Sequence, residues 1–384
     1  GGLRAGLGSV RGLLDRARTR GTQRVRVAVG EERIAGVRRA LGLARAAAPD
    51  TRLFEPPAEQ VKVPPFYRRL FAGQATWASE VLEEHTGAVG IARQAILQRP
   101  QGTLRTVAVL GPDGSGRRAL LGAVARGDRF GSARRVAFSA PASVSDVQDA
   151  LRDLSGEQLV VVTGLSWLVS AAPGGFEPLR ALVERVLVNG GRNPFMVEAD
   201  RLFWQWASSA APLAEIFPHA IVAPALEPEA LGRALLARNR LSGLELGFRG
   251  PESEERNRDR YFEALHRASD GLLQIALAYW LASLVEVEEA RGRVLVGTLP
   301  RSPHEGLRQL PEESFHPLFL VARQGWMTSP VLAGLLGRRE PEAQAILARL
   351  FGLGLLDRPA QGIYAVRIHL AGALQSVLRE RGWV

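Results

Sequence analysis

Apolar residues in the middle of the chain fall in short runs that alternate with stretches of helical spacing. The runs at residues 103–110, 135–139, 158–163, 194–199 and 220–223 have the length and composition of buried strands. Residues 117–126, 144–154 and 176–188 predict helices between them, and Ser143 or Ser145 is a candidate cap for the second helix. Strands that alternate with helices in this way predict an α/β fold with a parallel sheet covered on both faces.

The pattern becomes helical after this region. Residues 228–242, 261–269 and 272–288 predict helices, and the charged residues 249–260 predict an exposed loop. Near the C-terminal end, the sequence predicts helices at 317–324, 329–336 and 341–353, then short strands at 355–357 and 363–368. Three helices followed by a hairpin predict a winged helix. Ahead of the sheet, residues 25–29 alternate like a strand and residues 31–48 predict a helix.

Composition narrows the range of possible functions. The 384 residues are 46% hydrophobic, which is enough for a sizeable core. The absence of cysteine excludes disulfides, thiol catalysis and thiolate metal sites, and the six scattered histidines form no metal-binding pair. No apolar run approaches the ~20 residues that a membrane-spanning helix needs. The chain starts at Gly1 without a charged-then-apolar leader, so we expect a cytoplasmic protein.

The net charge of +10 has two explanations. Lys62 is the only lysine among 49 basic residues, and Ala, Gly, Arg, Leu and Val dominate the sequence. A GC-rich genome produces this bias, and this explanation is favoured. A basic surface also attracts phosphates and anionic lipids, so a polyanionic partner stays open.

A glycine-rich segment lies between the first predicted strand and the helix that follows it. Residues 111–118 read Gly-Pro-Asp-Gly-Ser-Gly-Arg-Arg, against the phosphate-loop pattern G-x-x-x-x-G-K-[ST]. In such a loop, glycines let backbone N–H groups surround phosphates, and the helix dipole favours the anion. The candidate nucleotide-binding residues are therefore Gly111, Asp113, Gly114, Ser115, Gly116, Arg117 and Arg118.

Two positions of this motif depart from the pattern. Arg117 replaces the lysine, and a guanidinium can still contact a phosphate. Arg118 replaces the hydroxyl residue that ligates magnesium, and an arginine cannot do so. At the end of the third predicted strand, where active P-loop enzymes hold magnesium with a carboxylate, Thr163 and Gly164 occupy the acidic positions. No catalytic residue and no magnesium site are predicted.

Seven stretches resemble bacterial ATPases of the STAND/AAA+ kind, and their order along the chain carries the resemblance. They are residues 65–71, 111–118, 160–167, 211–218, 235–243, 271–281 and 354–356, so the resemblance covers about residues 62–384. It implies a P-loop core, a helical lid and a C-terminal winged helix. It also implies that Glu198 stands at the polar sensor position and that Gln274 stands where the family usually has a basic sensor.

The expected organisation follows from pattern and resemblance together. Residues 1–60 are an N-terminal extension, a linker or the tail of a preceding domain, and residues 61–224 form the P-loop NTPase-like core. Residues 225–311 form the helical lid, and residues 312–384 form the winged-helix domain.

The favoured function is a pseudo-ATPase that acts as a scaffold or regulatory subunit through protein contacts, with ATP or ADP bound weakly or not at all. Its expected partner is a protein, either an active paralogue or a membrane-associated assembly that would bring it to the inner face of the membrane. Two alternatives stay open. One is a weak ATP-binding ATPase, and the other is a nucleic-acid-binding regulator that uses the winged helix. The third helix of that domain offers only Arg349 as a cation, which favours protein contacts over DNA.

Overall fold

The computed structural model describes residues 54–71, 86–97, 103–125, 133–154, 157–223, 225–288 and 292–384. The strand and helix predicted at residues 25–29 and 31–48 lie outside these ranges. Within the described residues, no helix combines the length and the apolar character needed to cross a membrane.

The centre of the fold is a five-stranded parallel sheet. Its strands are β1 (Thr106–Leu110), β2 (Arg134–Ala137), β3 (Val160–Thr163), β4 (Phe195–Ala199) and β5 (His219–Val222). The spatial order is β2-β3-β4-β1-β5, with every neighbouring pair parallel. The five predicted strands and the α/β class are confirmed. Strands β1 and β4 are buried along their whole length, as expected for central strands of a covered sheet.

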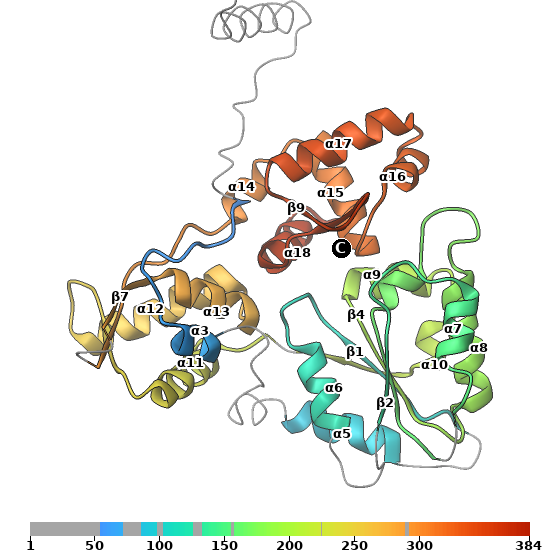
Figure 1. The fold of residues 1–384 in the computed structure, drawn as a ribbon, viewed down its shortest axis with the longest axis horizontal. Coiled ribbons are helices and arrows are strands. Elements are labelled where there is room, and N and C mark those ends of the chain that lie inside the picture. The colour runs from blue at the N-terminus through green and yellow to red at the C-terminus, as the bar shows by residue number, and fades with distance from the viewer. Residues whose placement is uncertain are drawn as a thin grey trace, which may run out of the picture. The chain divides into compact units, whose positions relative to one another are not determined.

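Helices cover both faces of this sheet (Figure 1). One face packs against α5 (Thr86–Leu97) and α6 (Arg117–Ala125). The other packs against α7 (Val144–Ala150), α8 (Glu177–Asn189), α9 (Arg201–Ser208) and α10 (Leu213–Ile216). Of the two candidate caps, Ser143 is the N-cap of α7, where it forms a reciprocal capping box with Asp146.

A second hydrophobic cluster combines helices with a small sheet. It contains α3 (Pro65–Phe71), α11 (Pro228–Ser242), α12 (Glu254–Ser269) and α13 (Leu273–Ala282). Strands β6 (Glu245–Phe248), β8 (Arg293–Val296) and β7 (Leu284–Glu288) form the sheet in that order. Tyr67 joins distant parts of this cluster, since its hydroxyl donates to Asn239 at 2.9 Å and accepts from the Trp280 ring N–H at 3.2 Å.

Two predictions in this region were wrong. The expected loop at residues 249–260 contains the start of α12, because Ser253 caps a helix whose first turn carries Glu254 and Glu255 near its positive end. The helix expected at residues 272–288 ends at Ala282 and is followed by β7. The alternation Leu-Val-Glu-Val-Glu has the period of a strand, which the helical interpretation overlooked.

A third cluster contains the C-terminal elements. These are α14 (His304–Arg308), α15 (Glu312–Gln324), α16 (Ser329–Leu336), α17 (Glu340–Gly352), β9 (Leu356–Ala360), β10 (Ile363–Val366) and α18 (Ala371–Glu380). Strands β9 and β10 are antiparallel. The three predicted helices and the hairpin are therefore present in the expected order, although α15 begins before Pro317 and includes it. Helix α18 was not predicted.

Candidate functional site at the phosphate loop

The glycine-rich loop connects β1 to α6 at the carboxyl edge of the sheet. The Gly111 N–H donates to the Ala199 carbonyl at 3.2 Å, which places the start of the loop beside the end of β4. Gly114 and Gly116 have φ values of 87° and 85°, which favour glycine. A Cβ at Gly111 would lie 2.6 Å from the Ser115 hydroxyl and 3.3 Å from the Ala223 Cβ, so a larger residue there would require the Ser115 side chain to move. The loop therefore has the glycine-dependent geometry that the motif predicts.

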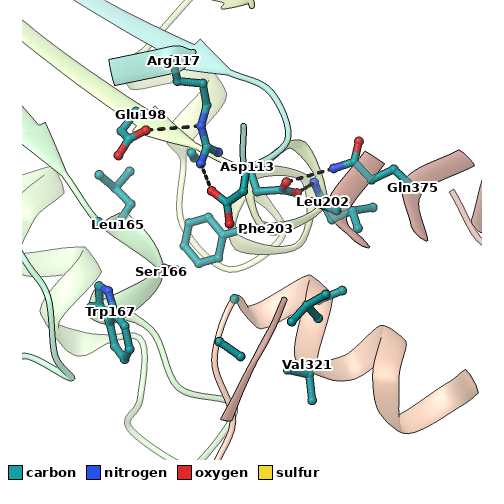
Figure 2. Close-up of a pocket in the computed structure, with 18 of the residues that line it drawn as sticks. Asp113, Arg117, Leu165, Ser166, Trp167, Glu198, Leu202, Phe203, Val321 and Gln375 are labelled. Carbon is teal, nitrogen blue, oxygen red and sulfur yellow. Dashed lines mark hydrogen bonds and ion pairs between the residues drawn. The ribbon is translucent and has the colours of Figure 1, made fainter. Parts of the chain in front are cut away.

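Arg117 is bound by its own loop. Its guanidinium donates to the Gly111 carbonyl at 2.7 Å and to the Asp113 carboxylate at 2.5 Å. Its Nε lies 3.2 Å from Oε2 of Glu198 (Figure 2). The residue is only 9% exposed. The cation at the lysine position is therefore already neutralised by protein carboxylates.

Arg118 shares the same carboxylate. Its Nε lies 3.1 Å from Oε1 of Glu198, while its side chain is 79% exposed. Glu198 is buried in β4, and its carboxylate links the two arginines. A buried carboxylate is costly unless it is paired, so this arrangement stabilises the charge of Glu198. A guanidinium occupies the position where a hydroxyl would ligate magnesium.

The turn at the end of β3 leaves no room for a side chain at position 164. Gly164 has φ of 78°, and a Cβ there would lie 2.0 Å from the Phe138 carbonyl oxygen. Thr163 is half-buried at the end of β3, where its carbonyl accepts from the Phe138 N–H at 3.0 Å. Over the described ranges, no group of three or more His, Asp or Glu side chains could hold a metal ion.

C-terminal residues contact the segment that follows β3, which forms a 3-10 turn at Leu165–Leu168. The Trp326 ring N–H donates to the Ser166 carbonyl at 2.7 Å, and the rings of Trp167 and Trp326 stack at 5.6 Å. The Gln324 side chain accepts from the Ala171 N–H at 3.1 Å. Sequence reasoning missed these contacts, because Trp326 follows the end of a helix and belongs to no periodic pattern.

Asp200 was also missed, although its position before α9 is typical of an N-cap. Its carboxylate accepts from the Leu202 N–H at 2.7 Å and from the Gln375 side chain of α18 at 2.9 Å. Burial raises the pKa of Asp200 to about 6, against the opposing field of Arg117. Asp200 is thus a carboxyl group with a raised pKa beside the phosphate loop.

These groups surround a cavity of about 250 Å³, which is small for a ligand site (Figure 2). The polar part of its lining includes Asp113, Arg117, Arg118, Glu198 and Asp200. Its apolar part includes Leu165, Phe203, Val321 and Leu374.

Five of the eleven predicted site residues line this cavity, namely Asp113, Arg117, Arg118, Gly164 and Glu198. The exposed residue Gln274 reaches the loop through its backbone, since its N–H lies 3.4 Å from the Gly114 carbonyl. Thr163 is outside the cavity lining.

No family model matches the chain, and no curated protein matches its sequence. Among solved structures, it is similar to the ORC2 protein of Aeropyrum pernix, with 16% identity, a TM-score of 0.41, and coverage of 87% of this chain and 98% of that one. It is also similar to the ORC1 protein of Aeropyrum pernix, solved in complex with DNA, with 14% identity, a TM-score of 0.43, and coverage of 83% of this chain and 98% of that one. A Walker-type ATPase of Pyrococcus abyssi has 11% identity, a TM-score of 0.41, and coverage of 81% of this chain and 99% of that one.

The sheet and the glycine loop define the fold of this chain. The parallel sheet has the order β2-β3-β4-β1-β5, and the glycine loop connects its inner strand β1 to a helix. In open α/β sheets, ligands bind at the carboxyl ends of the strands, which is where this loop lies. The chain has an α/β P-loop NTPase fold.

Proposed function

We propose that this chain is an AAA+-type pseudo-ATPase that acts as a scaffold or regulatory subunit through protein contacts. The observation that carries the proposal is the ion-pair cluster in which Glu198 binds both Arg117 and Arg118. Phosphoryl transfer by P-loop enzymes depends on a free cation at the phosphates and on a bound magnesium ion. In this chain the cations are paired with a protein carboxylate, and the hydroxyl that would hold the metal is absent.

The geometry at β3 supports the same proposal. A carboxylate at position 164 would require the Phe138 backbone to move, because even a Cβ would overlap its carbonyl oxygen. The loss of the acidic residue therefore involves the backbone as well as the side chain. Loss of both metal ligands removes charge stabilisation worth several kcal/mol, on the order of a 10³-fold lower rate or more.

The C-terminal elements support a role in protein contacts. We infer that they form a winged helix, since α15, α16, α17 and the β9–β10 hairpin follow the order of that motif. Helix α17 exposes Ala345, Ala348 and Phe351 together with the single cation Arg349. A helix that reads DNA normally presents several cations, so this face fits a protein surface better than a phosphate backbone.

Thermal unfolding with and without nucleotide tests the proposal. A ligand that binds only the folded state raises the melting temperature by an amount that grows with the logarithm of the ligand concentration divided by its dissociation constant. With ATP at millimolar concentration, we expect the same melting temperature whether or not magnesium is added, because the described residues contain no group of side chains that could hold a metal ion. A rise of several degrees that requires both ATP and magnesium would contradict the proposal. Arg117→Ala is the control, since a shift that survives it does not arise at the loop.

A further inference from the structure

The loop retains features of an anion site while its cations are occupied. Its glycines have the required conformation. The Arg117 and Arg118 N–H groups at the start of α6 have no partner within the helix, whereas those of Ala119 and Leu120 donate to the Gly116 carbonyl. The Ser115 hydroxyl is 4% exposed and has no hydrogen-bond partner among the described residues. These donors are typical of a loop that binds phosphate.

Glu198 reaches this loop because of the register of the sheet. Val109 of β1 is paired with Glu198 of β4. Glu198 is therefore one residue before the end of β4, where Ala199 accepts a hydrogen bond from the Gly111 N–H. Figure 2 shows the carboxylate directed at the Arg117 guanidinium. Glu198 is 3% exposed, and within the described part of the chain its Oε2 atom forms the ion pair with Arg117 but no hydrogen bond.

The charges in direct contact at the loop cancel. Arg117 and Arg118 contribute two positive charges, and Asp113 and Glu198 contribute two negative charges in direct contact with them. A polyphosphate approaching the loop therefore meets no net positive charge, and it must displace carboxylates from Arg117. Glu198 also repels the phosphate directly, because two like charges a few ångströms apart in a buried site interact strongly.

We propose that Glu198 is the residue that excludes polyphosphate from this loop, by acting as the internal anion of Arg117 and Arg118. The loop is then a latent site for a phosphate chain, and its specificity depends on the charge of one buried carboxylate. Asp113 assists from the solvent side, where it is 61% exposed. This inference rests on the proposed function, since it gives the physical reason why nucleotide would be held weakly or not at all.

The test is calorimetric titration of Glu198→Gln with tripolyphosphate at low salt and without magnesium. Glutamine keeps the size of the side chain and can still accept from the arginines, while it removes the charge. We expect at least tenfold tighter binding than in the unchanged protein, with loss of binding in the double variant Arg117→Ala/Glu198→Gln. Glu177→Gln on α8 makes the same change of net charge beside Arg180, outside the cavity lining, and should leave the affinity unaltered.

Three results would overturn the inference. They are equal affinity in Glu198→Gln and the unchanged protein, absence of binding in Glu198→Gln at millimolar ligand, and a gain that persists without Arg117. Asp113→Asn provides a second variant at an exposed position and should tighten binding by a smaller factor. ATP forms a parallel arm, because a gain for ATP but not for tripolyphosphate would mean that the loop is not responsible. No step requires magnesium, so the outcome is independent of whether the protein hydrolyses ATP.

Discussion

At the scale of single residues, the chemistry of this site depends on how a few charged groups are paired. Arg117 at the lysine position has the charge needed to contact a phosphate, but its contacts with Gly111, Asp113 and Glu198 satisfy it within the protein. Asp200 lies nearby and connects α9 to Gln375 of α18. Its carboxyl group makes the stability of the protein depend on pH.

The sign of that dependence follows from the raised pKa. Burial raises the pKa of Asp200 to about 6, so the folded protein binds this proton more tightly than the unfolded chain. The free energy of unfolding should therefore fall as pH rises from about 4 to about 6, by at most about 3 kcal/mol from this group. Asp200→Asn keeps an oxygen to cap α9 and should remove this part of the pH dependence.

Urea unfolding between pH 4 and pH 7.5 measures the effect. We expect the stability of Asp200→Asn relative to the unchanged protein to improve as the pH rises through this window. Curves for Asp200→Asn and the unchanged protein that stay parallel across this window would contradict the assignment.

At the scale of elements, the turn after β3 is the part of the site most constrained by packing. Gly164 combines φ of 78° with a backbone oxygen 2.0 Å from the place of a Cβ. The 3-10 turn that follows is held by Trp326 through a hydrogen bond to Ser166 and a ring stack on Trp167. The backbone conformation here is therefore specified by neighbours on both sides.

Gly164→Ala should be strongly destabilising. A left-handed conformation costs an alanine roughly 1–2 kcal/mol, and forced overpacking adds about 1–3 kcal/mol. Gly174 is a matched control, since its φ is 75° but no atom lies within 4 Å of the place of its Cβ. In chemical denaturation we expect Gly174→Ala to lose only the conformational part and Gly164→Ala to lose at least about 1 kcal/mol more. Equal losses would show that the close approach of Phe138 is not a constraint.

The elements of the core were predictable because their periodicity is strong. The five strands and the loop before α6 follow directly from apolar runs and glycine spacing. The β6-β8-β7 sheet was not predicted, since its strands are short and β7 directly follows a helix with no turn residue such as glycine or proline between them. At the site, the departures from the P-loop pattern at positions 117, 118, 163 and 164 are visible in the sequence itself. It could not predict that Glu198 pairs with both arginines, because that depends on the register between β1 and β4.

At the scale of the whole molecule, the phosphate loop is contacted from several parts of the chain. Gln274 of α13 approaches Gly114, and Gln375 of α18 binds Asp200 at the edge of the cavity. In a P-loop enzyme, contacts of this kind could transmit the state of the nucleotide to the rest of the protein. In a pseudo-ATPase they would instead hold a fixed arrangement, which suits a scaffold.

Single-turnover hydrolysis measures whether the protein carries out the chemical step at all. Labelled ATP would be mixed with an excess of protein and magnesium, so that slow product release cannot hide the chemical step. We predict that ADP forms no faster than in buffer, since neither Arg118 nor the end of β3 can hold the metal. The contradicting result is first-order ADP formation whose rate rises with protein concentration and is abolished by Arg117→Ala.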